Sequence, residues 1–164
     1  VDGERIKNTS SQLTFNQSFE VVDSQGGNRI LEQSSWGVTA EGAIKPDVTA
    51  SGFEIYSLTY NNQYQTMSGT SMASPHVAGV MTMLQSHLAE KYKGMNLDSK
   101  KLLELSKNIL MSSATALYSE EDKAFYSPRQ QGAGVVDAEK AIQAQYYVTG
   151  NDGKAKINLK RVGD

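Results

Sequence analysis

The chain has 164 residues, the size of one domain or of a piece of a larger one, so we expect a single hydrophobic core. Its 16 basic and 18 acidic residues give a formal charge of -2, which argues against binding to nucleic acid or to an anionic membrane surface. The absence of cysteine excludes disulfides, thiol nucleophiles and cysteine-ligated metal centres, and two histidines leave little for another metal site.

No apolar run approaches the length of a membrane span, and the first residues lack the layout of a signal peptide. The polar opening without an initiator methionine suggests an excised segment, so any export signal or anchor is expected outside this chain. Leu, Ile, Val and Phe are few enough to predict a thin core.

Before residue 70 the sequence predicts short strands separated by turns. Apolar residues alternate with polar ones in the first strand, turn residues at 24–28 follow it, and Asn61-Asn62 separates the last two strands as the turn of a hairpin. The predicted strands are 12–22, 46–50, 55–58 and 64–67.

After residue 70 the sequence predicts three helices. The first has apolar residues at i, i+3, i+4 and i+7, and Asp98 is a good N-cap for the second. We expect loop at 119–131, and a terminal hairpin whose strands, 146–148 and 157–159, flank Asn151-Asp152-Gly153. The predicted helices are 71–90, 98–113 and 137–143.

Ser71 lies between a glycine-marked turn and the start of the longest predicted helix. The first turn of a helix offers unpaired backbone N–H groups and a partial positive charge, so an oxyanion formed by attack of the Ser71 hydroxyl would find the Ser71 N–H aimed at it. Spacing alone equally fits a serine that only caps the helix.

The run Gly-Thr-Ser-Met-Ala-Ser-Pro-His-Val-Ala-Gly at 69–79 closely resembles the nucleophile motif of the subtilisin-like (subtilase) serine proteases. The resemblance continues in Ser-Ser-Trp-Gly at 34–37, Lys-Pro-Asp-Val at 45–48 and the glycine-rich segment 131–138. It is strongest to the cell-envelope branch, and within it to the streptococcal members that cleave chemokines and complement anaphylatoxins.

The resemblance implies that Ser71 is the catalytic nucleophile and that Thr70 places a hydroxyl near the oxyanion, although Thr70 fits a turn residue equally well. Subtilases also need an Asp, a His and an oxyanion Asn earlier in the chain, and their motifs occur nowhere here. Ser51 stands where the family usually has proline before Gly52.

The expected fold is therefore α/β, the C-terminal portion of a three-layer subtilisin-like catalytic domain with remnants of flanking β domains. Residues 1–30 resemble the tail of an inserted protease-associated domain, 31–143 the C-terminal part of the catalytic domain, and 144–164 a hairpin leading into a β-sandwich-like domain.

Other candidate residues have simpler interpretations. His76 lies five residues beyond Ser71, which on a helix turns it by ~140° and raises it ~7.5 Å, so we expect packing or hydrogen bonding and not a base. We expect His87 to complement the negative end of the helix dipole and Asp47 to have a structural role in a loop. Lys45 is expected to be solvated, although it could also form a Ser-Lys dyad with Ser71.

The resemblance implies a secreted, cell-wall-anchored endopeptidase acting on peptides or proteins, chemokines among them, with no cofactor in this segment and calcium only elsewhere in the enzyme. The partner is the upstream Asp- and His-bearing part of the domain, without which the chain is expected to be inert. Two alternatives are a non-catalytic structural or binding fragment and an α/β-hydrolase esterase. The esterase would need a histidine well after the serine, and His76 and His87 lie on the serine's own helix.

Overall fold

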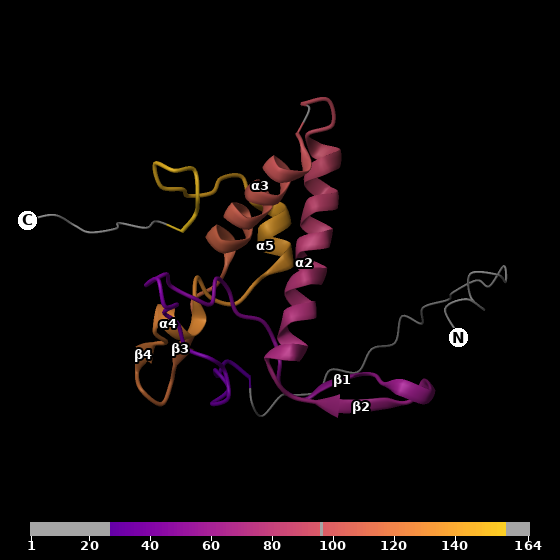
Figure 1. Ribbon diagram of the computed structural model, residues 1–164, viewed down its shortest axis with the longest axis vertical. Coiled ribbons are helices and arrows are strands. Elements are labelled where there is room, and N and C mark those ends of the chain that lie inside the picture. The colour runs from indigo at the N-terminus through magenta and orange to yellow at the C-terminus, as the bar shows by residue number, and fades with distance from the viewer. Residues whose placement is uncertain (1–26, 96, 157–164) are drawn as a thin grey trace, which may run out of the picture.

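The computed structural model describes residues 27–95 and 97–156, and Figure 1 shows helix α2 as its longest element. The predicted strand 12–22 lies outside the described residues. In chain order the elements are β1 (Ile55–Leu58), η1 (Tyr60–Asn62), β2 (Tyr64–Met67), α2 (Thr70–Lys91), α3 (Ser99–Ser113), β3 (Tyr118–Ser119), β4 (Ala124–Phe125), α4 (Pro128–Gln131) and α5 (Ala138–Gln143).

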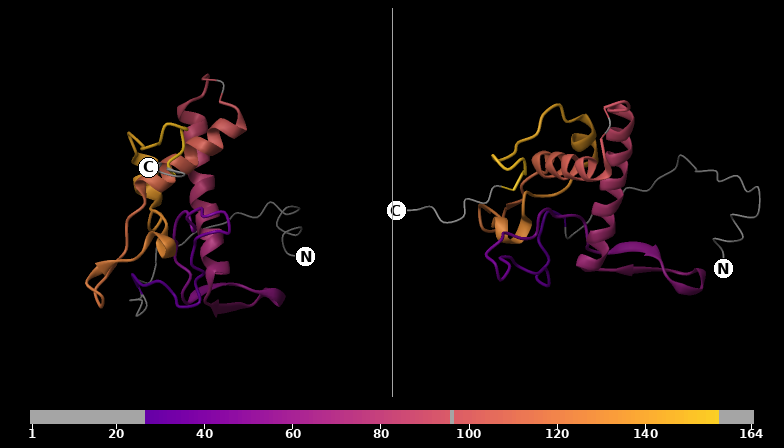
Figure 2. Two further views of the ribbon diagram at one scale, coloured as in Figure 1. Left: turned by 60° about the vertical axis from the view of Figure 1, so that its left-hand side comes forward. Right: turned by 45° about the horizontal axis from the view of Figure 1, so that its top comes forward.

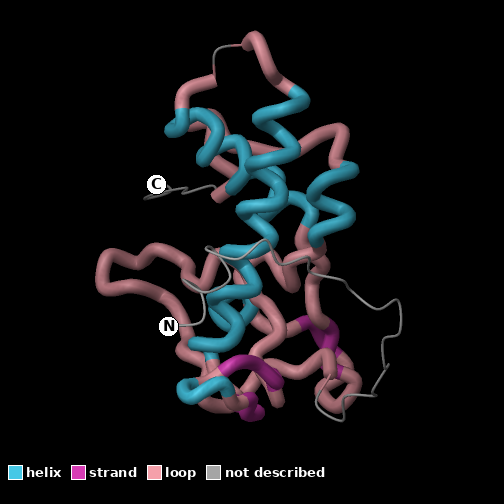
Figure 3. The backbone as a smooth tube through the Cα atoms, turned by 90° about the vertical axis from the view of Figure 1, so that its right-hand side faces the viewer, coloured by secondary structure: helices cyan, strands magenta, loops and turns pink. Residues whose placement is uncertain are grey.

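Helix α2 carries the core, as its apolar spacing predicts. Leu84 and Leu88 are buried, and they cluster with Ile109 and Leu110 of α3 and Ala141 of α5. The three helices pack together at the end of the molecule away from the strands (Figure 3). The predicted core face is confirmed, and the core is as thin as the composition predicts.

Carboxylates begin two of these helices. The side chain of Asp98 accepts a hydrogen bond from the Lys101 amide at the start of α3, and the side chain of Asp137 accepts one from the Lys140 amide at the start of α5. Both bonds satisfy amides that have no partner within the helix, so the predicted N-cap of α3 is confirmed. These backbone hydrogen bonds lower the pKa of Asp98 and of Asp137.

The strands form two small antiparallel sheets, β1 with β2 and β3 with β4. The predicted hairpin turn holds, because Asn61 and Asn62 adopt the positive φ that asparagine tolerates. Figure 2 shows this hairpin extending away from the helices. The predicted strand 46–50 appears only as a bridge in which Thr49 pairs in parallel with Val135, which also pairs with Thr115.

Residues 119–131 are more ordered than the predicted loop. They hold Ser119 of β3, all of β4, and α4, which begins with a capping box between Ser127 and Gln130. The Gln131 side chain is buried here, accepting a hydrogen bond from the Leu117 amide at 2.6 Å and donating one to the Tyr126 carbonyl at 2.6 Å. A local pattern could not predict these bonds because they join separate segments.

The end of the described chain is tied to the loop before α2. Lys156 donates hydrogen bonds to the Ile44 carbonyl and, at 2.9 Å, to Asp47, which also pairs with Lys45. Burial alone would raise the pKa of Asp47, but hydrogen bonds from the two lysines and their charges outweigh it and hold that pKa below its ordinary value. The Gly150 amide donates to the Lys154 carbonyl around the turn at 151–153. Since 157–159 lies outside the described residues, the terminal hairpin stays a prediction.

Across residues 27–95 and 97–156, no helix combines the length and the apolar character that crossing a membrane requires.

We predict that Gln131→Leu lowers the free energy of unfolding by about 2–4 kcal/mol. The substitution keeps the volume but leaves the buried Leu117 amide and Tyr126 carbonyl without partners. Urea unfolding followed by circular dichroism measures the change. Gln143→Leu, at an exposed position of α5, is the matched control and should change stability by less than about 0.5 kcal/mol. Equal effects of the two substitutions would contradict this role of Gln131.

Asp47→Asn is predicted to lower the melting temperature at pH 7 and to lower it less at pH 3. A carboxylate whose folded pKa is depressed stabilises the fold above its unfolded pKa, about 3.9, and that stabilisation is lost as the pH falls through the folded value. The effect should stay below about 1 kcal/mol because the side chain is 41% exposed. Thermal melts at both pH values test it, with Glu121→Gln in the exposed β3–β4 turn as control. A loss of equal size at pH 3 would show that the charge is not responsible.

Candidate active site

Ser71 is the second residue of α2 and is exposed to solvent. Helix α2 begins after Gly69, whose φ of 151° is one that side-chain-bearing residues rarely adopt. The Gly69 carbonyl accepts hydrogen bonds from the amides of Met72 and Ala73. The amides of Thr70 and Ser71 lie too early in the helix to have a carbonyl partner within it. The local sequence therefore places a free hydroxyl beside N–H groups that point out of the helix.

A close contact between two glycines fixes this turn. The Gly69 amide donates to the Gly52 carbonyl at 2.7 Å. A Cβ added to Gly52 would lie 2.7 Å from the Gly69 carbonyl oxygen and 3.2 Å from the Ala73 Cβ. Only glycine fits at 52, and this requirement holds the segment before the hairpin against the start of α2.

His76 strengthens the same contact. Its Nδ1 lies 2.8 Å from the carbonyl oxygen of Ser51, one residue before Gly52. The ring is thus engaged with the backbone of another segment, which confirms the predicted hydrogen-bonding histidine. Sequence reasoning did not identify the partner, because Ser51 attracts notice only as a substitution for the family's proline and its side chain plays no part in the bond.

The remaining candidates lie away from the Ser71 hydroxyl. His87 is half-buried sixteen residues further along α2, about 24 Å along the helix axis. Lys45 forms its ion pair with Asp47 instead of a dyad with serine. The residues that the structure describes therefore bring together a serine and backbone donors, without a base.

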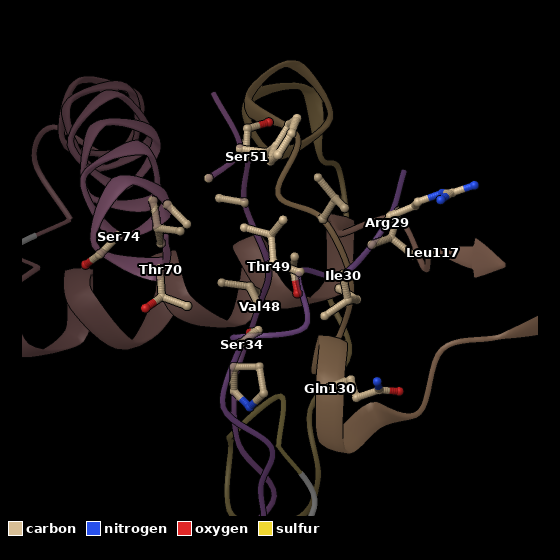
Figure 4. A pocket seen from close by; sticks show the side chains of 18 of the residues that line it. Arg29, Ile30, Ser34, Val48, Thr49, Ser51, Thr70, Ser74, Leu117 and Gln130 are labelled. Atoms are coloured by element: carbon tan, nitrogen blue, oxygen red, sulfur yellow. The ribbon is translucent and has the colours of Figure 1, made fainter. Parts of the chain in front are cut away.

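A cavity of about 640 Å³ lies beside the start of α2 (Figure 4). Thr70 and Ser74 line it from the helix, Thr49 and Ser51 from the facing segment, and Leu117 from the far side. Ser71 itself is not among the lining residues, so the cavity and the hydroxyl lie on neighbouring faces of α2. Thr70 faces the cavity and makes no hydrogen bond to Ser71 in the part of the chain that the structure describes.

Within the described residues, the segment beside this cavity is paired along one edge only. The Thr49 amide donates a hydrogen bond to the Gly134 carbonyl, and the Thr49 carbonyl accepts one from the Val136 amide. Both backbone groups of Thr49 therefore face the segment of Val135. Since successive residues of a strand direct their backbone groups to opposite sides, those of Val48 and Ala50 point away from Val135. This edge is able to pair with another strand.

Ser71 also heads a stripe of small exposed side chains along α2. Helix α2 carries apolar and small residues on all sides, the pattern of a helix that is buried all round. Its core face is covered by α3 and α5, whereas the stripe is not. The stripe consists of Pro75, Ala78, Thr82, Ser86 and Ala89.

Chemically, the arrangement offers one nucleophile and one oxyanion donor. A serine hydroxyl is a weak nucleophile unless a base removes its proton, and neither His76 nor His87 is placed to do so. Within residues 27–95 and 97–156, no three His, Cys, Asp or Glu side chains come together as metal ligands.

Comparison with known proteins supplies the context of this site. A model of the subtilase family, peptidase S8, matches residues 2–134. The C5a peptidase of Streptococcus pyogenes is 47% identical over 165 residues, covering 99% of this chain and 14% of the relative. The PII-type proteinase of Lacticaseibacillus paracasei is 37% identical over 143 residues, covering 81% of this chain and 8% of the relative. The chain thus spans a small part of the curated relatives it matches.

Among solved structures, the CspB protease of Clostridium perfringens superposes with a TM-score of 0.50 and 27% sequence identity. The match covers 65% of this chain and 22% of that protein. The subtilisin-like α/β class expected from the sequence is therefore confirmed.

We predict that His76→Ala loosens the start of α2 without unfolding the protein. The Gly69 amide should exchange with solvent deuterium faster, because its acceptor segment loses the bond to Ser51, while the Leu88 amide should change little. The free energy of unfolding should fall by about 1 kcal/mol. Thr82→Ala, which removes a side-chain bond to the Ala78 carbonyl on the same helix, is the control. Unchanged exchange at Gly69 in His76→Ala would contradict the role of the ring.

Proposed function

Because the chain belongs to the subtilase family, we propose that it supplies the nucleophilic serine, Ser71, of a secreted cell-envelope serine endopeptidase. The observation that carries the proposal is the exposed Ser71 in the first turn of α2, within the segment that the family model matches. In this reaction a base takes the Ser71 Oγ proton and Oγ bonds to the substrate carbonyl carbon. The resulting oxyanion accepts a hydrogen bond from the Ser71 N–H. We assign the Thr70 hydroxyl to the surroundings of that oxyanion.

The base, its carboxylate partner and the second oxyanion donor are proposed to come from the upstream Asp- and His-bearing part of the domain. Three surfaces support such a partner: the cavity beside Thr70, the edge at Val48 and Ala50, and the stripe headed by Ser71. Small side chains let another backbone approach closely, so the stripe suits a tightly packed element. Alone, the chain is then a folded but inert fragment.

The substrates and the location follow from the relatives as proposals. The Streptococcus pyogenes relative is named for cleavage of C5a, so we propose peptide or small protein substrates, with host chemokines and similar immune peptides as the class to test first. We place the enzyme outside the cell and attached to the wall. We propose that any calcium of the whole enzyme binds outside this segment.

We predict that a fluorophosphonate probe labels Ser71 only after the upstream segment is added to the chain. Without the base the hydroxyl stays protonated, and a missing oxyanion donor costs a further ~2.7–4 kcal/mol of transition-state stabilisation. Mass spectrometry of the labelled peptide locates the adduct. Labelling of the isolated chain would contradict this division of the site.

In the assembled enzyme, Ser71→Ala should lower kcat by roughly 10⁶ because the triad members act as a unit. Ser99→Ala, at an exposed position in the first turn of α3, is the matched control and should retain most activity. Substantial activity in Ser71→Ala would end the protease proposal.

A further inference from the structure

The β1–β2 hairpin exposes an aromatic face immediately before the serine. Tyr56 pairs with Thr66 and Leu58 pairs with Tyr64, so the four side chains share one side of the hairpin. Tyr56 is 70% exposed, Leu58 69% and Tyr64 56%. The rings of Tyr56 and Tyr64 stack, with centroids 5.3 Å apart. We call Tyr56, Leu58 and Tyr64 the aromatic face.

Stabilisation of the hairpin alone does not account for this face. The stacked pair supports the hairpin, as cross-strand aromatic pairs do, but exposed Leu58 gains nothing from the stacking and Tyr60 at the tip is 78% exposed. No residue from 55 to 68 is charged. A two-stranded hairpin in water usually carries charged side chains at its edges, which discourage pairing with other chains.

The other hairpin of the molecule provides a contrast. It also carries an exposed aromatic pair, Tyr118 with Phe125, but its turn has four charged residues in succession, 120–123. Figures 1 and 2 show the two hairpins on opposite sides of the start of α2. Of the two hairpins in the described residues, only the one that leads to Ser71 combines exposed rings with an uncharged turn.

The position of the face suits a polypeptide bound at Ser71. Strand β2 ends at Met67, four residues before the serine. An extended chain spans at most about 3.6 Å per residue, so Tyr64 lies within about 25 Å of Ser71 along the backbone. A substrate whose scissile carbonyl meets the Ser71 hydroxyl therefore reaches the face with residues no more than about eight positions from the cleaved bond.

We propose that the aromatic face binds an extended, uncharged segment of the polypeptide substrate that flanks the scissile bond. The inference rests on the proposed function of Ser71 and adds a determinant of substrate choice to it. Tyrosine rings offer apolar area with a polar tip, which suits aliphatic or aromatic side chains of the bound segment. Among the described residues, β1 and β2 pair only with each other. Their outer edges can therefore pair with an extended chain, whose specificity then comes from alternate side chains. Charged residues in that segment would lose hydration without gaining a partner.

The test compares short and extended substrates of the assembled enzyme. The short substrate is a chromogenic peptide that fills only the positions next to the scissile bond. Two longer peptides add eight residues, with alternate leucines, on the N-terminal or the C-terminal side. In the double variant Tyr56→Ser/Tyr64→Ser, KM for one of the longer peptides should rise roughly 10- to 100-fold while its kcat stays unchanged. Both kcat and KM for the short substrate should stay unchanged.

Three further variants act as controls. Tyr56→Phe/Tyr64→Phe keeps both rings and should retain most of the affinity for the long peptide. Phe125→Ser removes a ring of equal exposure from the other hairpin and should change nothing. A long peptide whose added leucines are replaced by aspartates should bind weakly to the unaltered enzyme and lose its sensitivity to the tyrosines.

The outcomes separate this inference from the function it rests on. Unchanged KM for both long peptides in Tyr56→Ser/Tyr64→Ser would overturn it. Equal losses of activity on short and long substrates would overturn it too, since the face would then be covered by the rest of the enzyme. A change in oligomeric state would also overturn it, since a second copy would then occupy the face. An assembly that cleaves none of the substrates would overturn the proposed function and this inference together.

Discussion

The hydrogen bond from the Gly69 amide to the Gly52 carbonyl is the constraint on which the site depends. It closes the segment 52–69 at its base, so the hairpin leaves and returns at one point, and the returning strand must turn directly into α2. The absence of a side chain at Gly52 permits the approach, and the bond between His76 and Ser51 secures it from the helix side. The direction of the first turn of α2, and with it the Ser71 hydroxyl, follows from this contact.

The described surfaces that remain open share one explanation. Helix α2 is covered by α3 and α5 on its core face only, the segment of Thr49 is paired on one edge only, and a cavity separates the two. A domain evolved to stand alone would not leave a helix with small and apolar residues on every side half exposed. The proposed upstream part of the domain would account for these surfaces, and the chain spans 14% of its streptococcal relatives.

Much of the helical structure could be predicted from the sequence because its determinants are local. The spacing of Leu84 and Leu88, and the caps Asp98 and Asp137, lie within the helices they define. The second strand pair and the buried Gln131 were missed because their hydrogen bonds join separate segments. Ser71 can be predicted from its motif, whereas the residues that hold it in place cannot. Glycine is required at 52 because of the carbonyl oxygen of Gly69, seventeen residues away, and no periodicity in the sequence indicates that contact.

The bridge between Thr49 and Val135 has a consequence for how the molecule assembles in time. The helices and hairpins are built from contacts between neighbours in sequence, which form quickly, whereas this bridge joins residues on either side of nearly the whole helical unit. Closing so long a loop costs more chain entropy than any hairpin, and folds rich in such contacts form slowly. During synthesis the segment of Thr49 leaves the ribosome long before Val135, so this bridge forms only after residues 50–135 have been made. A strand of the proposed upstream part that bound this segment earlier would act as a template for its folding.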